Sequence, residues 1–309
     1  MLMLQSYQNL LETSQRVNWR VDDLIGGDKR LDFSKPFLPE VFVGAAKLAF
    51  LAPHERLALN HIRAHCYLAM FELVETFILP FITAQADVSH ADDDPHRAPA
   101  FANFATEEAK HIALFQRFRA DFTAGFGLPC PIIGPADAIS KAILAHSPLS
   151  VALLVLGIEW MSQGHYVESV RDEAELDPQF KSLLKHHWIE EAQHAKLDGM
   201  LVRAMAEKCD ATEIARAIDE YLEMIAFLDA GLKKQVGLDL TTFETCLGRT
   251  LSDVERDALL RHQLQALRWT MLGTAMRNAN FLSVIDSLGG DARARISAAA
   301  LHYQPLDLS

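Results

Sequence analysis

The sequence lacks the features that mark a disulfide-bonded secreted domain or a nucleic-acid-binding protein. Only four cysteines occur in 309 residues, without a Cys-x-x-Cys pair, and no secretory signal precedes the first predicted helix. We therefore expect a reducing, cytoplasmic environment. The formal net charge is -12, and no cluster of Lys and Arg provides the basic surface that a nucleic acid or an anionic membrane requires. We expect neither as a partner.

Transmembrane runs, strand patterns and linkers are also scarce. The most apolar stretch, residues 151–161, is too short to cross a bilayer and contains Glu159, so it predicts a buried core helix. Alternating β-branched runs are nearly absent, whereas apolar residues recur at three-and-four spacing over long windows. This pattern predicts an all-α protein. Without a segment rich in Pro, Gly or Ser, we predict one domain over residues 1–309.

The positions of proline, glycine and capping residues predict where the helices begin and end. Residues 1–50 are expected to be irregular or partly helical, and residues 91–99 to form a loop. The expected helices cover residues 53 to 80 or beyond, 100–126, 136–146, 148–173, 179–209, 211–236 and 253–278, followed by a helical tail. The region from about 53 to 209 contains the motifs below, and residues 210–309 are a helical extension.

The motif Glu-Glu-Ala-x-His occurs twice, at residues 107–111 and 190–194. On an α-helix, residues three apart lie about 60° apart around the axis and about 4.5 Å along it, so both side chains can reach one point. The two pairs with this spacing are Glu108 with His111 and Glu191 with His194. One Glu-x-x-His pair is common on solvated helix faces, but two matched copies are much harder to reach by chance and indicate a functional site.

An upstream glutamate precedes each motif at a distance that fits a helix, a turn and a return. Glu72 follows the apolar run of residues 67–71, and Glu159 follows that of residues 153–158. A carboxylate in such surroundings costs several kcal/mol unless a positive group meets it. Two divalent metal ions would do so, and this mixture of carboxylates and imidazoles suits iron or manganese.

His187 is predicted to be a third imidazole ligand. It precedes Glu191 by four residues and His194 by seven, which places the three side chains on one helix face. The predicted metal ligands form one set of seven residues, and no catalytic residue beyond them is expected. They are Glu72, Glu108, His111, Glu159, His187, Glu191 and His194.

The order Glu, Glu-x-x-His, Glu, His-x-x-x-Glu-x-x-His resembles the p-aminobenzoate N-oxygenase family of ferritin-like di-iron oxygenases. The resemblance covers about residues 60–200 and includes Met70-Phe71-Glu72 and residues 107–111. It implies a ferritin-like four-helix bundle with additional flanking helices. It also implies a di-iron site that activates dioxygen and oxidises an arylamine, or a similar small organic substrate, at nitrogen.

Several assignments remain open at the level of sequence. Glu75 lies one turn after Glu72 and is its rival as the first ligand. Glu107 and Glu190 share a helix face with the motif histidines, so geometry alone does not choose within each doublet. The ferritin-like precedent favours Glu108 and Glu191, which leaves Glu107 and Glu190 as surface groups or as groups that support the ligands.

The remaining polar candidates have blander interpretations. We expect His61, His65 and His165 to be structural, and Tyr67 and Tyr166 to pack in the core rather than carry a radical. Spacing alone makes Asp198 and Glu173 candidates to orient ligand histidines. The bundle interior and substrate wall are expected to include five apolar side chains, Phe71, Phe104, Phe115, Met161 and Met200.

The expected function is therefore that of an oxygenase. The chain has no glycine-rich nucleotide motif and no iron-sulfur cysteine set, so electrons must come from an external reductase or ferredoxin. The alternatives are a ferritin-type iron-binding or ferroxidase protein and a di-iron hydroxylase or desaturase that acts on carbon. The helix-rich apolar surfaces favour a homodimer.

Overall fold

A computed structural model describes residues 6–88 and 94–306, and no β-strand occurs within these ranges. The all-α prediction is confirmed. The elements are α1 Tyr7–Ser14, α2 Val21–Leu24, α3 Glu40–Val43, η1 Ala45–Lys47, α4 Pro53–Asp87, α5 Arg97–Phe126, α6 Ala136–Leu144, α7 Pro148–Gly164, η2 His165–Val170, α8 Pro178–Ala206, α9 Ala211–Leu247, α10 Asp253–Arg268, η3 Trp269–Gly273, α11 Thr274–Arg277, α12 Ala279–Ser287, α13 Ala292–Ala300 and η4 Leu301–Tyr303.

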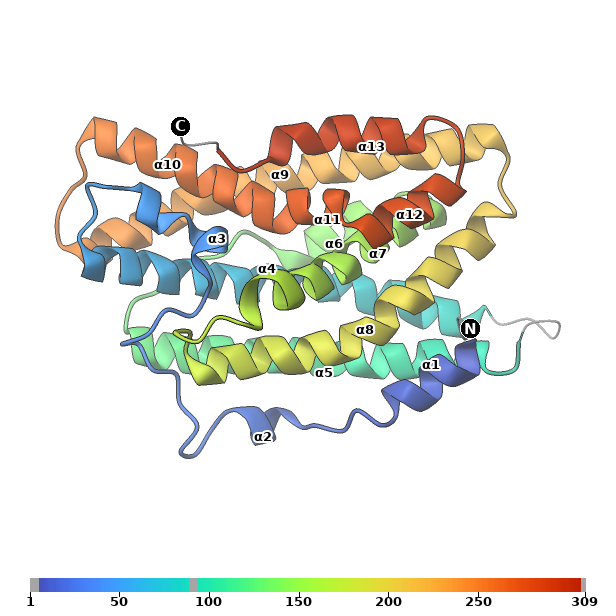
Figure 1. The fold of residues 1–309 in the computed structure, drawn as a ribbon, viewed down its shortest axis with the longest axis horizontal. Helices are drawn as coiled ribbons and strands as arrows, with labels where there is room; N and C mark the ends of the chain where they lie inside the picture. The colour runs from blue at the N-terminus through green and yellow to red at the C-terminus, as the bar shows by residue number, and fades with distance from the viewer. Residues whose placement is uncertain (1–5, 89–93, 307–309) are drawn as a thin grey trace.

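Four long helices form the central bundle (Figure 1). Helix α4 packs along α5, α7 packs along α8, and α5 also contacts α8. The C-terminal helices lie on one side of this bundle, where α9 covers α4 and α7 and supports α10 and α13. The N-terminal segment, residues 6–24 with α1 and α2, lies on the other side, where both helices contact α5 and α8. Polar groups between the four helices are therefore covered from both sides.

Local chemistry explains the ends of the bundle helices. Proline occupies the first turn of α4, α7 and α8, where its missing N–H costs no helical hydrogen bond. Asp177 caps α8 by accepting a 2.7 Å hydrogen bond from the Phe180 amide. Helix α5 ends at Gly127, whose φ of 75° favours glycine because other residues are strained there.

The observed helix boundaries differ from the predicted ones mainly where the apolar periodicity continues past the predicted end of a helix. Helix α5 begins at Arg97 rather than at residue 100, and α9 extends to Leu247 rather than to residue 236. Residues 91–93 of the predicted loop lie outside the described residues. Helix α7 is followed by a π-helical turn, His165–Val170, so the predicted helix over 148–173 is α-helical only as far as Gly164.

One helix, α4, is long and apolar enough to cross a membrane by length and composition alone. In the described residues, 67% of its most apolar window is buried inside the protein, as in the core helix of a bundle. Its buried side chains join a hydrophobic core to which the N-terminal and C-terminal helices also contribute. This continuity supports the single-domain prediction, which stays a prediction.

Candidate metal centre

Two overlapping groups of buried ligand atoms lie between the four bundle helices. One group contains Glu75, His111, His187 and Glu191, and the other contains Glu108, His111, Glu191 and His194. Within each group, one ligand atom per residue lies within 4.8 Å of all the others. The structure thus brings together residues of α4, α5 and α8, as a site for two metal ions requires.

Glu191 occupies the centre of this arrangement. Its Oε1 atom lies 2.5 Å from His187 Nε2 and 3.2 Å from His111 Nδ1. Its Oε2 atom lies 2.8 Å from His194 Nδ1. The two carboxylate oxygens therefore face different histidines, so Glu191 could serve as a ligand to both of two metal ions. The helical spacing of His187, Glu191 and His194 places all three on one face of α8, as predicted.

The side chains at this site fit metal ions because several of their buried polar atoms make no well-oriented hydrogen bond within the protein. Atoms of Glu75, Glu108, Glu159, His111 and His187 are buried without a well-oriented hydrogen bond among the described residues, and the close polar neighbours of several of them are other ligand atoms. These buried atoms are Glu75 Oε2, both carboxylate oxygens of Glu108, Glu159 Oε2, His111 Nδ1 and His187 Nε2. An unpaired buried polar atom costs about 1–3 kcal/mol, so several together favour a bound cation.

Glu159 of α7 lies outside both ligand groups but approaches Glu191 from the remaining bundle helix. It is buried, and it lies close enough to Glu191 for the two carboxyl groups to share a hydrogen bond. Burial, and then the charge of the neighbouring carboxylates, raises the pKa of both Glu159 and Glu75 well above the usual range. Burial acts on Glu191 in the same direction, but the three histidines outweigh it and hold the pKa of Glu191 well below that range.

The first glutamate of each motif supports the histidine of the other motif. His111 Nε2 donates to Glu190 Oε2 over 2.9 Å, and His194 Nε2 donates to Glu107 Oε2 over 2.8 Å. These bonds leave Nδ1 of each imidazole facing the ligand groups. A carboxylate behind a metal-binding histidine fixes its tautomer and orientation. Glu107 and Glu190 therefore have the supporting role that the sequence left open.

The structure places Glu75, the rival of Glu72 as the first ligand, in one of the two ligand groups. The Glu72 carboxylate pairs with Arg119 and accepts a 3.2 Å hydrogen bond from Gln116, outside both ligand groups. Glu75, one turn later on α4, is the ligand that we propose in place of Glu72. The ligand set that we now expect is Glu75, Glu108, His111, Glu159, His187, Glu191 and His194.

The other polar candidates divide between structural and supporting positions. His61 Nε2 donates to the Lys35 carbonyl oxygen, as a structural histidine does. His165 lies between the Tyr67 hydroxyl and the Thr270 carbonyl oxygen, outside both ligand groups. Asp198 is buried beside His194 without a hydrogen-bond partner among the described residues.

Glu173 is exposed on the far side of the π-helical turn, so the suggestion that it orients a ligand histidine was wrong. The sequence also missed two supporting side chains from the N-terminal segment. Ser14 donates to Glu107, and the Trp19 ring stacks on His111 with 6.2 Å between ring centroids. No motif marks either residue, because both act through contacts between segments far apart in the chain.

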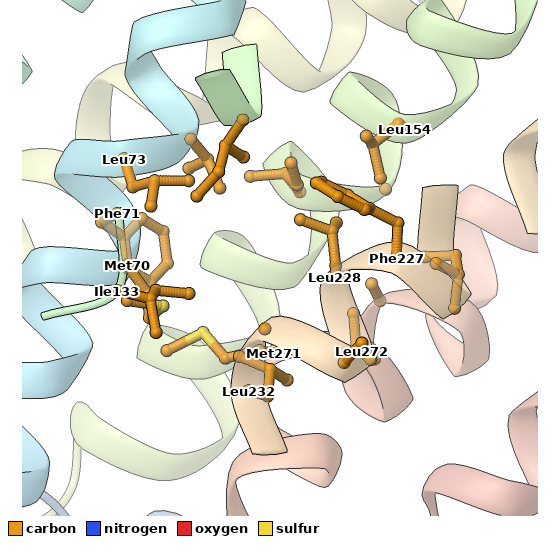
Figure 2. Close-up of a pocket in the computed structure, with 18 of the residues that line it drawn as sticks. Met70, Phe71, Leu73, Ile133, Leu154, Phe227, Leu228, Leu232, Met271 and Leu272 are labelled. Atoms are coloured by element: carbon orange, nitrogen blue, oxygen red, sulfur yellow. The ribbon is translucent and has the colours of Figure 1, made fainter. Parts of the chain in front are cut away.

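The bundle contains a cavity of about 570 Å³, whose lining side chains are shown in Figure 2. Apolar side chains of α4, α7, α9 and η3 line it, and Lys234 is the only charged residue among its described lining. Phe71 lines this cavity and also contacts His187, with 5.4 Å between the ring centroids. Phe71 thus forms part of the wall between the cavity and the candidate metal site.

No protein family model matches the chain, and no curated protein matches it. Among solved structures, it is similar to a glycine-to-leucine mutant of an R2-like ligand-binding oxidase with an Fe/Fe cofactor. The identity is 15% and the TM-score 0.50, over 91% of this chain and 94% of that one. A glycine-to-phenylalanine mutant with an Mn/Fe cofactor has 13% identity and a TM-score of 0.46, over 88% and 97%. The first likeness shows the fold, which confirms the predicted ferritin-like bundle with flanking helices.

The Glu72 and Glu75 variants form a matched pair that tests the revised ligand set. We expect Glu75→Gln to lower the iron content of anaerobically loaded protein from two ions per chain to about one, because it removes a ligand charge. Glu72→Gln should retain two, since Glu72 pairs with Arg119. Elemental analysis after removal of unbound iron measures both. The reverse pattern would restore Glu72 as the ligand.

Metal binding should become weaker as the pH falls. Burial lowers the pKa of His111 and His194, but the surrounding carboxylates outweigh it and raise both pKa values well above the ordinary histidine value. The raised pKa values favour the protonated form of both imidazoles without metal, so a metal ion must displace their Nδ1 protons. Each displaced proton lowers the affinity about tenfold per pH unit of acidification.

Calorimetry of cobalt binding in buffers of different ionisation enthalpy counts the released protons. We expect at least about two protons per chain, on the argument that each ligating imidazole must be neutral. His194→Gln should release fewer. An affinity that does not change between pH 6 and 8 (roughly the range around the ordinary histidine pKa) would contradict the assigned protonation.

Proposed function

We propose that the chain is a di-iron oxidoreductase that activates dioxygen and oxidises an organic substrate. The observation that supports this most strongly is the pair of overlapping buried ligand groups, both of which contain Glu191. Carboxylate and imidazole ligands in a helical bundle suit iron, with manganese as the alternative. The Fe/Fe cofactor of the similar oxidase supports the choice of iron.

Two iron ions held by these ligands would supply the electrons that reduce dioxygen. The protein's own contribution is to hold and shield them. Glu107 and Glu190 fix the two motif imidazoles, while the Phe104 ring stacks on His194 with 3.7 Å between centroids. The ligand side chains are buried, so bulk water is kept from the reacting groups.

The apolar cavity supports oxidation of an organic molecule rather than storage of iron. Its size is typical of a small-molecule site, and an iron store needs no such space. Lys234 offers a partner for an anionic group on the substrate. The ligand pattern resembles that of the p-aminobenzoate N-oxygenases, so we propose N-oxygenation of an arylamine. The same cavity suits an alkyl chain oxidised at carbon, which is the alternative.

The catalytic cycle requires electrons from outside the chain. All four cysteines are free and none belongs to a cluster of metal-binding groups among the described residues. We therefore propose an external reductase or ferredoxin as the donor and dioxygen as the oxidant. A cytoplasmic location and a homodimer stay predictions.

Product analysis decides between the candidate reactions. Reduced, iron-loaded protein is mixed with oxygen and a panel of arylamines, fatty acids and acyl thioesters, and the products are identified by mass spectrometry. We expect an N-oxygenated arylamine, with at least about a hundredfold less product from His194→Ala, which loses a metal ligand. His54→Ala, at an exposed position of α4, is the matched control and should retain activity.

Oxidation of only an acyl or alkyl substrate would overturn the proposed N-oxygenation, but it would still support an oxygenase that acts on carbon. Oxygen consumption that only converts ferrous to ferric iron, with release of the iron, would instead indicate a ferritin-type protein.

A further inference from the structure

The two supporting glutamates have different partners on their outer sides. Glu190, which accepts from His111, also forms an ion pair with the Lys110 ammonium group. Glu107, which accepts from His194, also accepts from the Ser14 hydroxyl, whose Oγ lies 2.6 and 2.7 Å from the two carboxylate oxygens. One carboxylate is therefore paired with a cation, whereas the other is paired with a neutral hydroxyl group.

The N-terminal segment maintains this difference. Ser14, the last residue of α1, is itself held by a 3.0 Å hydrogen bond from the Asn103 side-chain amide. Trp19, a few residues later, places its ring 4.1 Å from the Lys110 ammonium nitrogen and stacks on His111. Ser14 thus supplies a neutral donor to Glu107, and Trp19 fixes Lys110 beside Glu190.

With two metal ions bound, the negative charge behind His111 would be balanced, but the negative charge behind His194 would not. The four ligand carboxylates, Glu75, Glu108, Glu159 and Glu191, would be balanced by two divalent ions. Lys110 balances Glu190. Glu107 has no cationic partner other than His194 among the described residues, and the nearby Asp198 is a carboxyl group that cannot provide one. In a buried environment, an unbalanced negative charge strengthens the binding of a cation considerably.

We infer that the two metal positions are unequal and that the position bound by His194 fills first. The excess charge of Glu107 acts through His194, which becomes the stronger donor. Lys110 weakens the corresponding effect of Glu190 on His111, whose Nδ1 faces the same Glu191 oxygen as His187 and which therefore belongs to the other position. Ser14 and Trp19 are positioning residues in this scheme. The inference rests on the di-metal site proposed above and adds an order of binding set by the N-terminal segment.

Anaerobic addition of cobalt(II) to the metal-free full chain tests this order. Calorimetry and the visible absorption of bound cobalt should resolve two steps, of which the first is tighter. Glu107→Gln keeps a hydrogen-bond acceptor but removes the charge, so it should weaken the first step about 10–100-fold and leave the second nearly unchanged. Lys110→Gln exposes His111 to the full charge of Glu190, so it should instead strengthen the second step.

Two further variants separate positioning from folding. Ser14→Ala should weaken the first step by a smaller factor than Glu107→Gln does, and Ser14→Thr, which retains the hydroxyl, should restore it. Lys185→Gln removes an exposed lysine of α8 and should leave both steps as in the wild type. A purely structural role would instead shift both steps together, without rescue by threonine.

The possible results distinguish this inference from the proposed function. Two cobalt ions bound in equal steps, or equal effects of Glu107→Gln and Lys110→Gln on the same step, would overturn the inference while the di-metal site stands. Fewer than two ions bound by the wild type would overturn both.

Discussion

The burial of acidic side chains inside an apolar bundle is the constraint on which the rest of the structure depends. Glu75, Glu108, Glu159 and Glu191 are all nearly inaccessible to solvent. Gathering them costs far more than the marginal stability of a folded domain unless protons, imidazolium groups or metal ions compensate. The raised pKa values of Glu75 and Glu159 show the compensation that protons provide without metal. Two divalent ions would replace those protons, and His111, His187 and His194 would provide the remaining ligands.

The surrounding helices pack against the candidate metal centre on two sides. On the outer side of α5 and α8, the N-terminal segment brings Ser14 and Trp19 to the groups that support the histidines. On the other side, α9 and the segment after α10 close an apolar cavity against α4 and α7. The candidate metal ligands therefore lie between a polar, hydrogen-bonded layer and the apolar cavity, with Phe71 at the boundary of that cavity.

The sequence predicted the bundle helices and most of the ligand groups because both depend on local periodicity. The Glu-x-x-His spacing and the phase of His187 follow from the geometry of one helix. The choice between Glu72 and Glu75 does not, since both lie on a similar face of α4 and the deciding partner, Arg119, is on α5. Ser14 and Trp19 were missed for the same reason. The π-helical turn after Gly164 gave no signal, because its residues are also compatible with an ordinary helix.

Anomalous X-ray diffraction from crystals of the iron-loaded protein tests the di-metal centre most directly. Data collected on both sides of the iron absorption edge locate each ion without reference to activity. We predict two iron peaks between α4, α5, α7 and α8, one next to Glu75 and His187 and the other next to Glu159 and His194, with Glu191 between them. A single peak, or iron bound only at surface carboxylates, would contradict a di-iron centre and the oxygen chemistry proposed from it.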